Sequence, residues 1–502
     1  MKRLSEIPEV QIGDCGPAEW LVGAPPIPQK ESAFSRIKDP LPRTVLRWAF
    51  WAILVLLLPA AIDANPDTGS PSRMIINESP EFEVGPFLET LEDSKQNLDY
   101  ETVRSLDASH FKPADSLNSL NLGFQHSDYW GRVDLENRSK KEHFFFSHPI
   151  SLTDHLEIWF KTRAGTTHLK SGDIYPFSEK TVPYYGHAFR LDLPPGETGQ
   201  LVIRMHTTSA IWFSFGLETE DSFLASQEQD YLLLGGYAGL MAVMIVYNLV
   251  MFFSIRDGSF LTYIIYILLF ALSQLALKGI GAQYIWGEWP LWNNYSFLVL
   301  VGLASAALLI FSVQFLNLSQ YLPGMRYFLL GLAIVALPAS LLPFLTGYAT
   351  AVRIVNIYAL ILPVLVICIA IWIARKGYVP AQYYIFAFLF FFAGAMIFSA
   401  AARGWLPANI WTANAMLSGS AVQVVLLSLG LGSRINGLRL EKEKAQAATI
   451  ETQENLLRVF HRFVPRQFIE HLKVDRIEEL RLGDHIEQEM TVCFCDVRSF
   501  TT

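Results

Sequence analysis

The sequence predicts a multidomain membrane protein with an exported all-β sandwich, a seven-helix transmembrane bundle and a cytoplasmic signalling helix. Only 17% of the 502 residues are charged, whereas soluble proteins usually carry about 25%. Uncharged runs long enough to span a bilayer fill residues 231–433, and the stretch before them has the alternating pattern of strands. The net charge of −8 argues against a nucleic-acid binder.

Residues 1–46 are polar and rich in proline and glycine, and we interpret them as a disordered cytoplasmic tail. Residues 47–64 begin with Arg47 and continue as the uncharged run 48–62. As a helix this run would rise only about 22 Å, less than the roughly 30 Å of a hydrocarbon core. Basic residues before it and small residues after it are typical of a signal peptide or signal anchor, so the following segment is exported. Whether the segment is cleaved stays open.

Residues 65–230 are predicted to form the exported β-sandwich sensor domain. Short apolar-polar alternations are separated by turn signals such as Gly172-Asp173 and Pro194-Pro195-Gly196. This spacing favours antiparallel strands in a sandwich. No cysteine lies in this range, so no disulfide framework holds it together. The clearest alternations are at 129–135, 156–160, 189–193 and 201–205.

Residues 231–433 are predicted to contain seven membrane-spanning helices. The basic residues after the last helix and the exported domain before the first place the C-terminus in the cytoplasm. An uncleaved 47–64 would make eight spans. The expected helices are 231–254, 259–278, 296–316, 327–346, 354–374, 383–402 and 413–433.

Polar residues within these helices are few, and no Asp, Glu, Lys or Arg lies mid-span. Ion-coupled transporters normally need such groups, so transport is disfavoured. The amides are expected to form interhelical hydrogen bonds. They are Asn248, Gln274, Gln314, Asn356, Asn414 and Gln423.

Residues 434–464 are predicted to continue as a signalling helix. A heptad seam can be drawn from Ile435 to Phe463, but Lys442 and Thr449 occupy seam positions in its middle. We interpret it as a weak parallel coiled coil that joins a homodimer, with a solvated single helix as the alternative. The helix is expected to end before Pro465.

The last segment, 465–502, carries the residues with the clearest chemistry. Thr491–Phe494 has the composition of a buried strand, and Asp496 follows its end. A carboxylate at that position can hold a divalent metal against phosphates. Cys493 and Cys495 share one face of this strand, and free thiols are favoured over a metal site there.

Residues 494–501, Phe-Cys-Asp-Val-Arg-Ser-Phe-Thr, resemble the opening of a class III adenylate/guanylate cyclase domain, Phe-x-Asp-Ile-x-Gly-Phe-Thr. The segment 462–468 resembles the approach to many bacterial cyclase domains. The resemblance implies that Asp496 and the backbone carbonyl of Val497 bind Mg²⁺ or Mn²⁺, and that ATP or GTP becomes a cyclic nucleotide and pyrophosphate. Ser499 departs from the usual Gly.

This cyclase domain is expected to be truncated after its first strand. Such a domain needs roughly 180 residues, and the second metal carboxylate and the transition-state residues have no positions before Thr502. The 502-residue chain is therefore expected to be inactive alone, with no tightly bound cofactor.

A second resemblance covers the membrane region. Residues 247–249, 255–257, 263–266 and 279–286 are similar to bacterial seven-transmembrane receptors with diverse intracellular signalling modules. In that family an extracytoplasmic jelly-roll-like domain comes first, and residues 121–137 look like it. The resemblance implies binding of a carbohydrate or similar small molecule.

Aromatic residues of the exported segment are candidates to stack on such a ligand, although a place in the sandwich core is favoured. They are Trp130, Trp159, Tyr184 and Trp212. His143, His148 and His155 could bind a metal, but scattered structural histidines are favoured.

The leading hypothesis is a receptor that senses an extracytoplasmic small molecule and controls a class III nucleotide cyclase. One alternative is a non-enzymatic receptor or regulatory subunit that pairs with a full-length copy. Another is a permease with an exported lid, which the absence of charged membrane residues disfavours.

Overall fold

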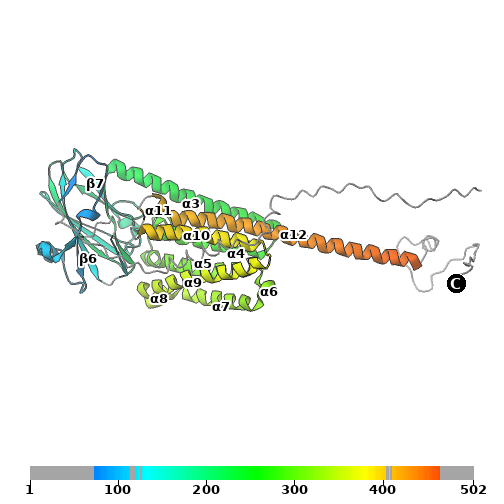
Figure 1. The fold of residues 1–502 in the computed structure, drawn as a ribbon. Coiled ribbons are helices and arrows are strands. Elements are labelled where there is room, and N and C mark those ends of the chain that lie inside the picture. The colour runs from blue at the N-terminus through cyan, green and yellow to red at the C-terminus, as the bar shows by residue number, and fades with distance from the viewer. Residues whose placement is uncertain (1–72, 114–119, 125–126, 403–405, 407–409, 464–502) are drawn as a thin grey trace, which may run out of the picture.

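The computed structural model describes residues 73–113, 120–124, 127–402, 406 and 410–463. The predicted tail 1–46, the signal segment 47–64 and the cyclase segment 465–502, with Asp496 and Val497, lie outside the described residues. Figure 1 shows three parts in a row: a β domain, a bundle of helices, and a single long helix that leaves the bundle at the far end.

The β domain, residues 73–219, consists mainly of two sheets that face a common apolar core. In the larger sheet the order is β4-β3-β6-β11-β8-β9, and β1 adds to β6 as the only parallel pair among the described strands. The smaller sheet has the order β10-β7-β13-β2, and β5 and β12 form a separate pair. The predicted β-rich character of this domain is confirmed, with the short helix α2 (Tyr100–Ser105) as an addition. The bounds are β1 Met74–Ile76, β2 Glu81–Glu83, β3 Glu89–Asp93, β4 Lys112–Pro113, β5 Leu120–Phe124, β6 Asp128–Asn137, β7 His143–His148, β8 His155–Thr162, β9 Gly165–Ser171, β10 His187–Asp192, β11 Thr198–His206, β12 Ala210–Phe213 and β13 Gly216–Thr219.

Alternation along the strands places one set of side chains in the core. Leu201 and Ile203 of β11 pack there against Phe146 of β7 and Leu217 of β13. Because side chains of a strand alternate between faces, the intervening Val202 points to the opposite face, where it packs with Trp130 and the short helix α2 (Tyr100–Ser105).

The helical part begins with α3 (Glu220–Ile255), directly after β13. Five described helices are long and apolar enough to cross a membrane: α3, α4, α5, α10 and α12. The segments Pro323–Ala339 and Ile361–Arg375 are shorter apolar helices. The other bounds are α4 Gly258–Leu277, η5 Ala282–Trp286, α5 Pro290–Phe315, α6 Leu318–Tyr321, α7 Pro323–Ala339, α8 Leu342–Thr346, α9 Tyr348–Arg375, α10 Pro380–Ala402, α11 Ile410–Ala413 and α12 Ala415–Phe463.

Two of the expected helices differ most from the structure. The range 327–346 is divided into α7 and α8, and Pro343 lies in the first turn of α8, where its missing N–H is tolerated. The first helix starts at residue 220 instead of 231, because its polar first turns pack on the β domain.

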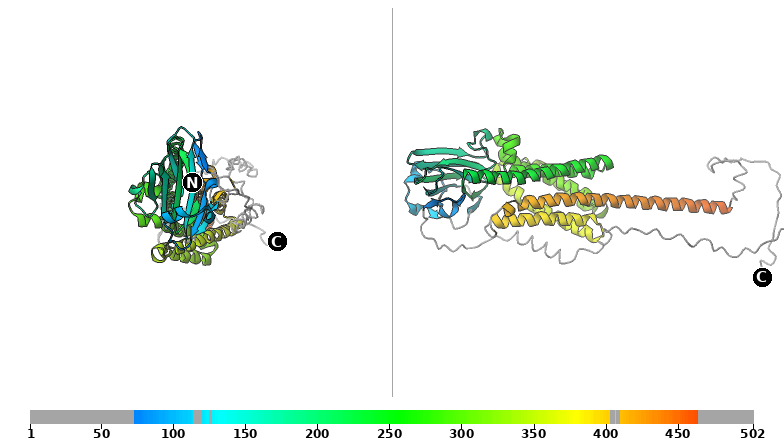
Figure 2. Two further views of the ribbon diagram at one scale, coloured as in Figure 1. Left: turned by 90° about the vertical axis from the view of Figure 1, so that its left-hand side faces the viewer. Right: turned by 90° about the horizontal axis from the view of Figure 1, so that it is seen from above.

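Helix α12 runs without a break from the bundle into solvent (Figure 2). Its first half packs closely on α10: a Cβ on Gly419 would lie 2.7 Å from Phe390 O. From Asn436 to Val459 every residue is exposed. The segment from residue 434 onward, predicted as a separate signalling helix, is thus the direct extension of a bundle helix.

Candidate functional site

Two contacts join the β domain to α3 and to residues 277–294. The first is the junction of β13 and α3, where the strand ends at Thr219 and the helix begins at Glu220. Phe223 of α3 stacks on Phe145 of β7 with ring centroids 4.5 Å apart. Tyr184 also packs against the ring of Phe223. No linker separates the strand from the helix, so the smaller sheet and α3 are joined directly.

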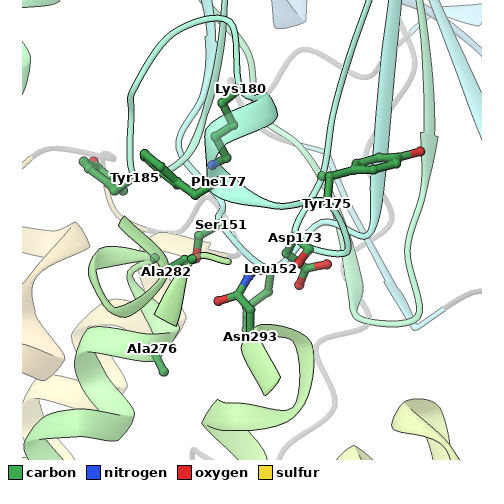
Figure 3. A pocket seen from close by; sticks show the side chains of 13 residues that line it. Ser151, Leu152, Asp173, Tyr175, Phe177, Lys180, Tyr185, Ala276, Ala282 and Asn293 are labelled. Atoms are coloured by element: carbon green, nitrogen blue, oxygen red, sulfur yellow. Dashed lines mark hydrogen bonds between the residues drawn. The ribbon is translucent and has the colours of Figure 1, made fainter. Parts of the chain in front are cut away.

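The second place, which we call the domain contact, joins residues 151–154 and 172–187 of the β domain to residues 277–294 (Figure 3). The Phe177 N–H donates to Gly287 O at 2.9 Å, and Ser151 Oγ donates to Leu277 O at 2.9 Å. Asn293 Nδ2 of α5 donates to Asp173 O at 3.0 Å. The domain contact is therefore specific and held by directional bonds.

Gly279 brings the two parts this close. Its φ is +79°, and a Cβ there would overlap Tyr185 O and lie 2.6 Å from Ser151 Cβ. Only glycine combines that backbone conformation with that approach.

Buried ionisable groups line the domain contact. Burial raises the pKa of Asp173 well above its usual range, and the neighbouring Asp154 adds to the effect. Burial lowers the pKa of Lys180 to about 8. Its Nζ donates to Tyr184 O at 3.2 Å and to Gly186 O at 2.6 Å. The space between these groups is small, so it suits a proton or a water rather than an organic ligand.

A second polar cluster lies where two central strands of the larger sheet end, at the start of β6 and the end of β11. The buried Asp128 carboxylate accepts from Arg204 Nη2 at 2.7 Å and from His206 Nδ1 at 2.7 Å. Burial opposes ionisation of Asp128, but the hydrogen bonds from His206 and Arg204 hold its pKa below the usual value. The hydrogen bond between His206 and Asp128 raises the pKa of His206. This cluster joins β6 to β11 and lies within the β domain.

The aromatic candidates do not form one surface. Trp130 is fully buried and stacks on the half-buried Trp159 at 5.5 Å, beneath α2. Tyr184 is buried in the other cluster, beside Phe223 at the start of α3. Trp212 is on β12. The positions of Trp130 and Tyr184 agree with the core alternative.

The candidate metal histidines have separate partners. His143 Nδ1 is 2.7 Å from Asp192 Oδ1, and His155 Nδ1 is 3.0 Å from Tyr175 OH. Burial lowers the pKa of His148 to about 4, so its imidazole is neutral at neutral pH. Among the described residues, no three His, Cys, Asp or Glu side chains are grouped so as to hold a metal ion.

Hydrogen bonds link α12 to α3 and α4 along the bundle. Gln423 Nε2 donates to Tyr266 OH at 3.2 Å, and Asn248 Nδ2 donates to Ser428 Oγ at 3.0 Å. At the far end, Arg434 Nη1 is 3.3 Å from Asp257 Oδ2, with both side chains largely buried. Asn248 and Gln423 therefore make the interhelical bonds expected of them.

Sequence reasoning did not connect Asp173 with Asn293 and Asn294 across the domain contact. Gly172-Asp173 has the signal of an ordinary turn, and Asn293 and Asn294 have that of a polar helix start. Because these residues lie about 120 positions apart, no local pattern connects them.

The architecture defines a multi-pass membrane protein with an extracellular β-rich domain, the organisation of a transmembrane signalling receptor. Comparison with protein families gives the same result: residues 85–219 match the model "7TMR-DISM extracellular 2", and residues 230–434 match "7TM diverse intracellular signalling". The chain thus carries the extracellular and membrane domains of the seven-transmembrane receptors with diverse intracellular signalling. None of the curated proteins compared with the chain matches it.

Proposed function

We propose that this receptor senses a small molecule, such as a carbohydrate, outside a bacterial inner membrane and controls a class III nucleotide cyclase inside. In this proposal α3, α4, α5, α7, α9, α10 and α12 cross the membrane and the C-terminus is cytoplasmic. The observation that supports this proposal is the direct connection of the parts. Strand β13 continues into α3 without a linker, and α12 leaves the bundle as one continuous helix.

The signal would be a shift between two arrangements of the helices. A ligand that binds one arrangement of the β domain more tightly favours the matching position of α3. Since α12 is hydrogen-bonded to α3 and α4, its exposed extension would follow. Two such extensions would pair as the coiled coil of a homodimer, supported by exposed apolar residues such as Leu438, Leu456 and Val459.

The output is proposed from the motif at residues 494–501. Asp496 and the Val497 carbonyl would bind Mg²⁺ or Mn²⁺, which supplies charge neutralisation for the phosphates of ATP or GTP when bound. The rival proposal is a non-enzymatic receptor or regulatory subunit, and the mass and activity of the native protein separate the two.

The test begins with the mass of the native protein, detected by an antibody against residues 85–220. A complete cyclase domain of roughly 180 residues adds about 20 kDa to the 56.6 kDa of this chain. If the larger protein is found, its membranes are expected to make cyclic nucleotide from ATP or GTP in the presence of Mn²⁺. The substitution Asp496→Asn is expected to abolish this activity. A protein of the smaller mass whose membranes make none favours the regulatory subunit.

The Arg434–Asp257 pair is expected to hold α12 at the exit from the bundle. Arg434→Gln removes the ion pair and the bond to Ser259, at a cost of about 1–3 kcal/mol. Nitroxide labels on Leu438 and Leu261, with the native cysteines replaced, should then show a broader distance distribution in nanodiscs.

The matched control is Arg439→Gln, five residues further along α12. Arg439 is 79% exposed and pairs only with Glu443 of its own helix among the described residues. It should leave the distribution unchanged. An equal broadening in both variants would contradict the role given to Arg434.

A further inference from the structure

Two carboxyl groups of the β domain share one amide of a membrane helix at the domain contact. Asn294 Nδ2 of α5 lies 3.3 Å from Asp173 Oδ1 and 3.5 Å from Asp154 Oδ1. Both aspartates are buried, with 5% and 6% of their surface exposed. Two negative charges so close to each other and so far from water repel strongly, so such a pair tends to keep one proton.

The surroundings decide which carboxyl keeps it. Asp154 has more hydrogen-bond donors around it, because it also accepts from Thr207 Oγ1 at 3.3 Å, from Thr208 N at 3.0 Å and from Thr208 Oγ1 at 2.8 Å. From the other residues in the described part of the chain, the Asp173 carboxyl receives a hydrogen bond only from Asn294. The proton therefore belongs to Asp173.

The other charged or titratable groups near Asp173 are Lys180, on the loop after β9, and Tyr348, in the first turn of α9. Lys180 could stabilise an ionised Asp173. However, its ammonium is bound to two backbone carbonyls and loses its proton near pH 8. Tyr348 is neutral at these pH values and offers no positive charge.

We propose that the domain contact binds one proton at Asp173, so that the receptor also senses the acidity of the medium outside the membrane. Acid favours the docked arrangement of the β domain on α5, and alkali loosens it. The proton is a second input, separate from the small molecule and from whatever output the cytoplasmic part controls.

The direction follows from linkage. In the separated arrangement Asp173 is hydrated and has an ordinary pKa of about 3.9, whereas burial in the docked arrangement raises the pKa. The docked arrangement therefore binds more protons between these two values. The equilibrium constant for docking is largest at acid pH. It falls about tenfold for each pH unit above the pKa of the hydrated carboxyl, until the docked carboxyl itself ionises.

The test is hydrogen exchange of the Phe177 amide, which donates to Gly287 O across the domain contact. The full chain in nanodiscs is compared with Asp173→Asn from about pH 5 to about pH 9, each pair at the same pH so that the intrinsic exchange rate cancels. The matched control is Asp134→Asn, at an exposed position of β6 where the carboxylate accepts from Gln200 of β11.

In the wild type, protection of Phe177 should fall relative to Asp173→Asn by up to about tenfold for each pH unit, and Asp134→Asn should follow the wild type. A constant ratio between wild type and Asp173→Asn at every pH would overturn the proposal. If Asp173→Asn does not fold, the wild type decides alone, since protection of Phe177 must fall with pH relative to the ladder amides of β11. The measurement needs no ligand and no cyclase, so its result is independent of the proposed function.

Discussion

Gly279→Ala is expected to undo the domain contact while the β domain and the helix bundle each keep their own fold. A side chain at φ +79° costs about 1–2 kcal/mol. The new methyl group would also overlap Tyr185 O, a backbone atom that cannot move aside without shifting the loop. We expect a total loss of about 3 kcal/mol or more, which is at least about a hundredfold in the docked population.

Gly196→Ala is the matched control for this substitution. Gly196 has a φ of +78°, but a Cβ added there would have no atom within 4 Å. The substitution Gly196→Ala therefore has the energetic cost of a side chain at positive φ but no steric overlap. Exchange of the Phe177 amide should rise sharply in Gly279→Ala and stay near the wild type in Gly196→Ala. Equal exchange in both variants would show that the close approach of Tyr185 does not govern docking.

Trp130→Ala is expected to lower the free energy of unfolding of the β domain by about 3–5 kcal/mol. The indole is fully buried and packs with Val103, Phe111 and Val202, so its removal leaves a large cavity. The slowest ladder amides of β11, measured by hydrogen exchange in the full chain, report this loss.

Trp159→Ala is the comparison for the aromatic candidates. Trp159 is only half buried and stacks between Tyr100 and His168, so its loss should cost clearly less. If Trp130→Ala has little effect on stability but abolishes binding of a soluble sugar, Trp130 is a ligand-binding residue instead of a core residue.

The helices were predictable because their signal is local. Long uncharged runs show where α3, α4, α5, α10 and α12 lie. The alternation at 201–205 likewise indicated β11 before any contact was known. Boundaries that depend on neighbours were not predictable: α3 starts at Glu220 because Phe223 packs on Phe145 of the smaller sheet.

The sequence by itself determined the order of the parts, an exported β domain followed by a membrane region, because hydrophobic period and length are properties of contiguous residues. Only the tertiary structure brought Asp154 and Asp173 to one amide of Asn294 and placed Tyr185 against Gly279. These contacts join residues far apart in the chain. Their energies depend on burial, charge and approach, which exist only once the two domains meet.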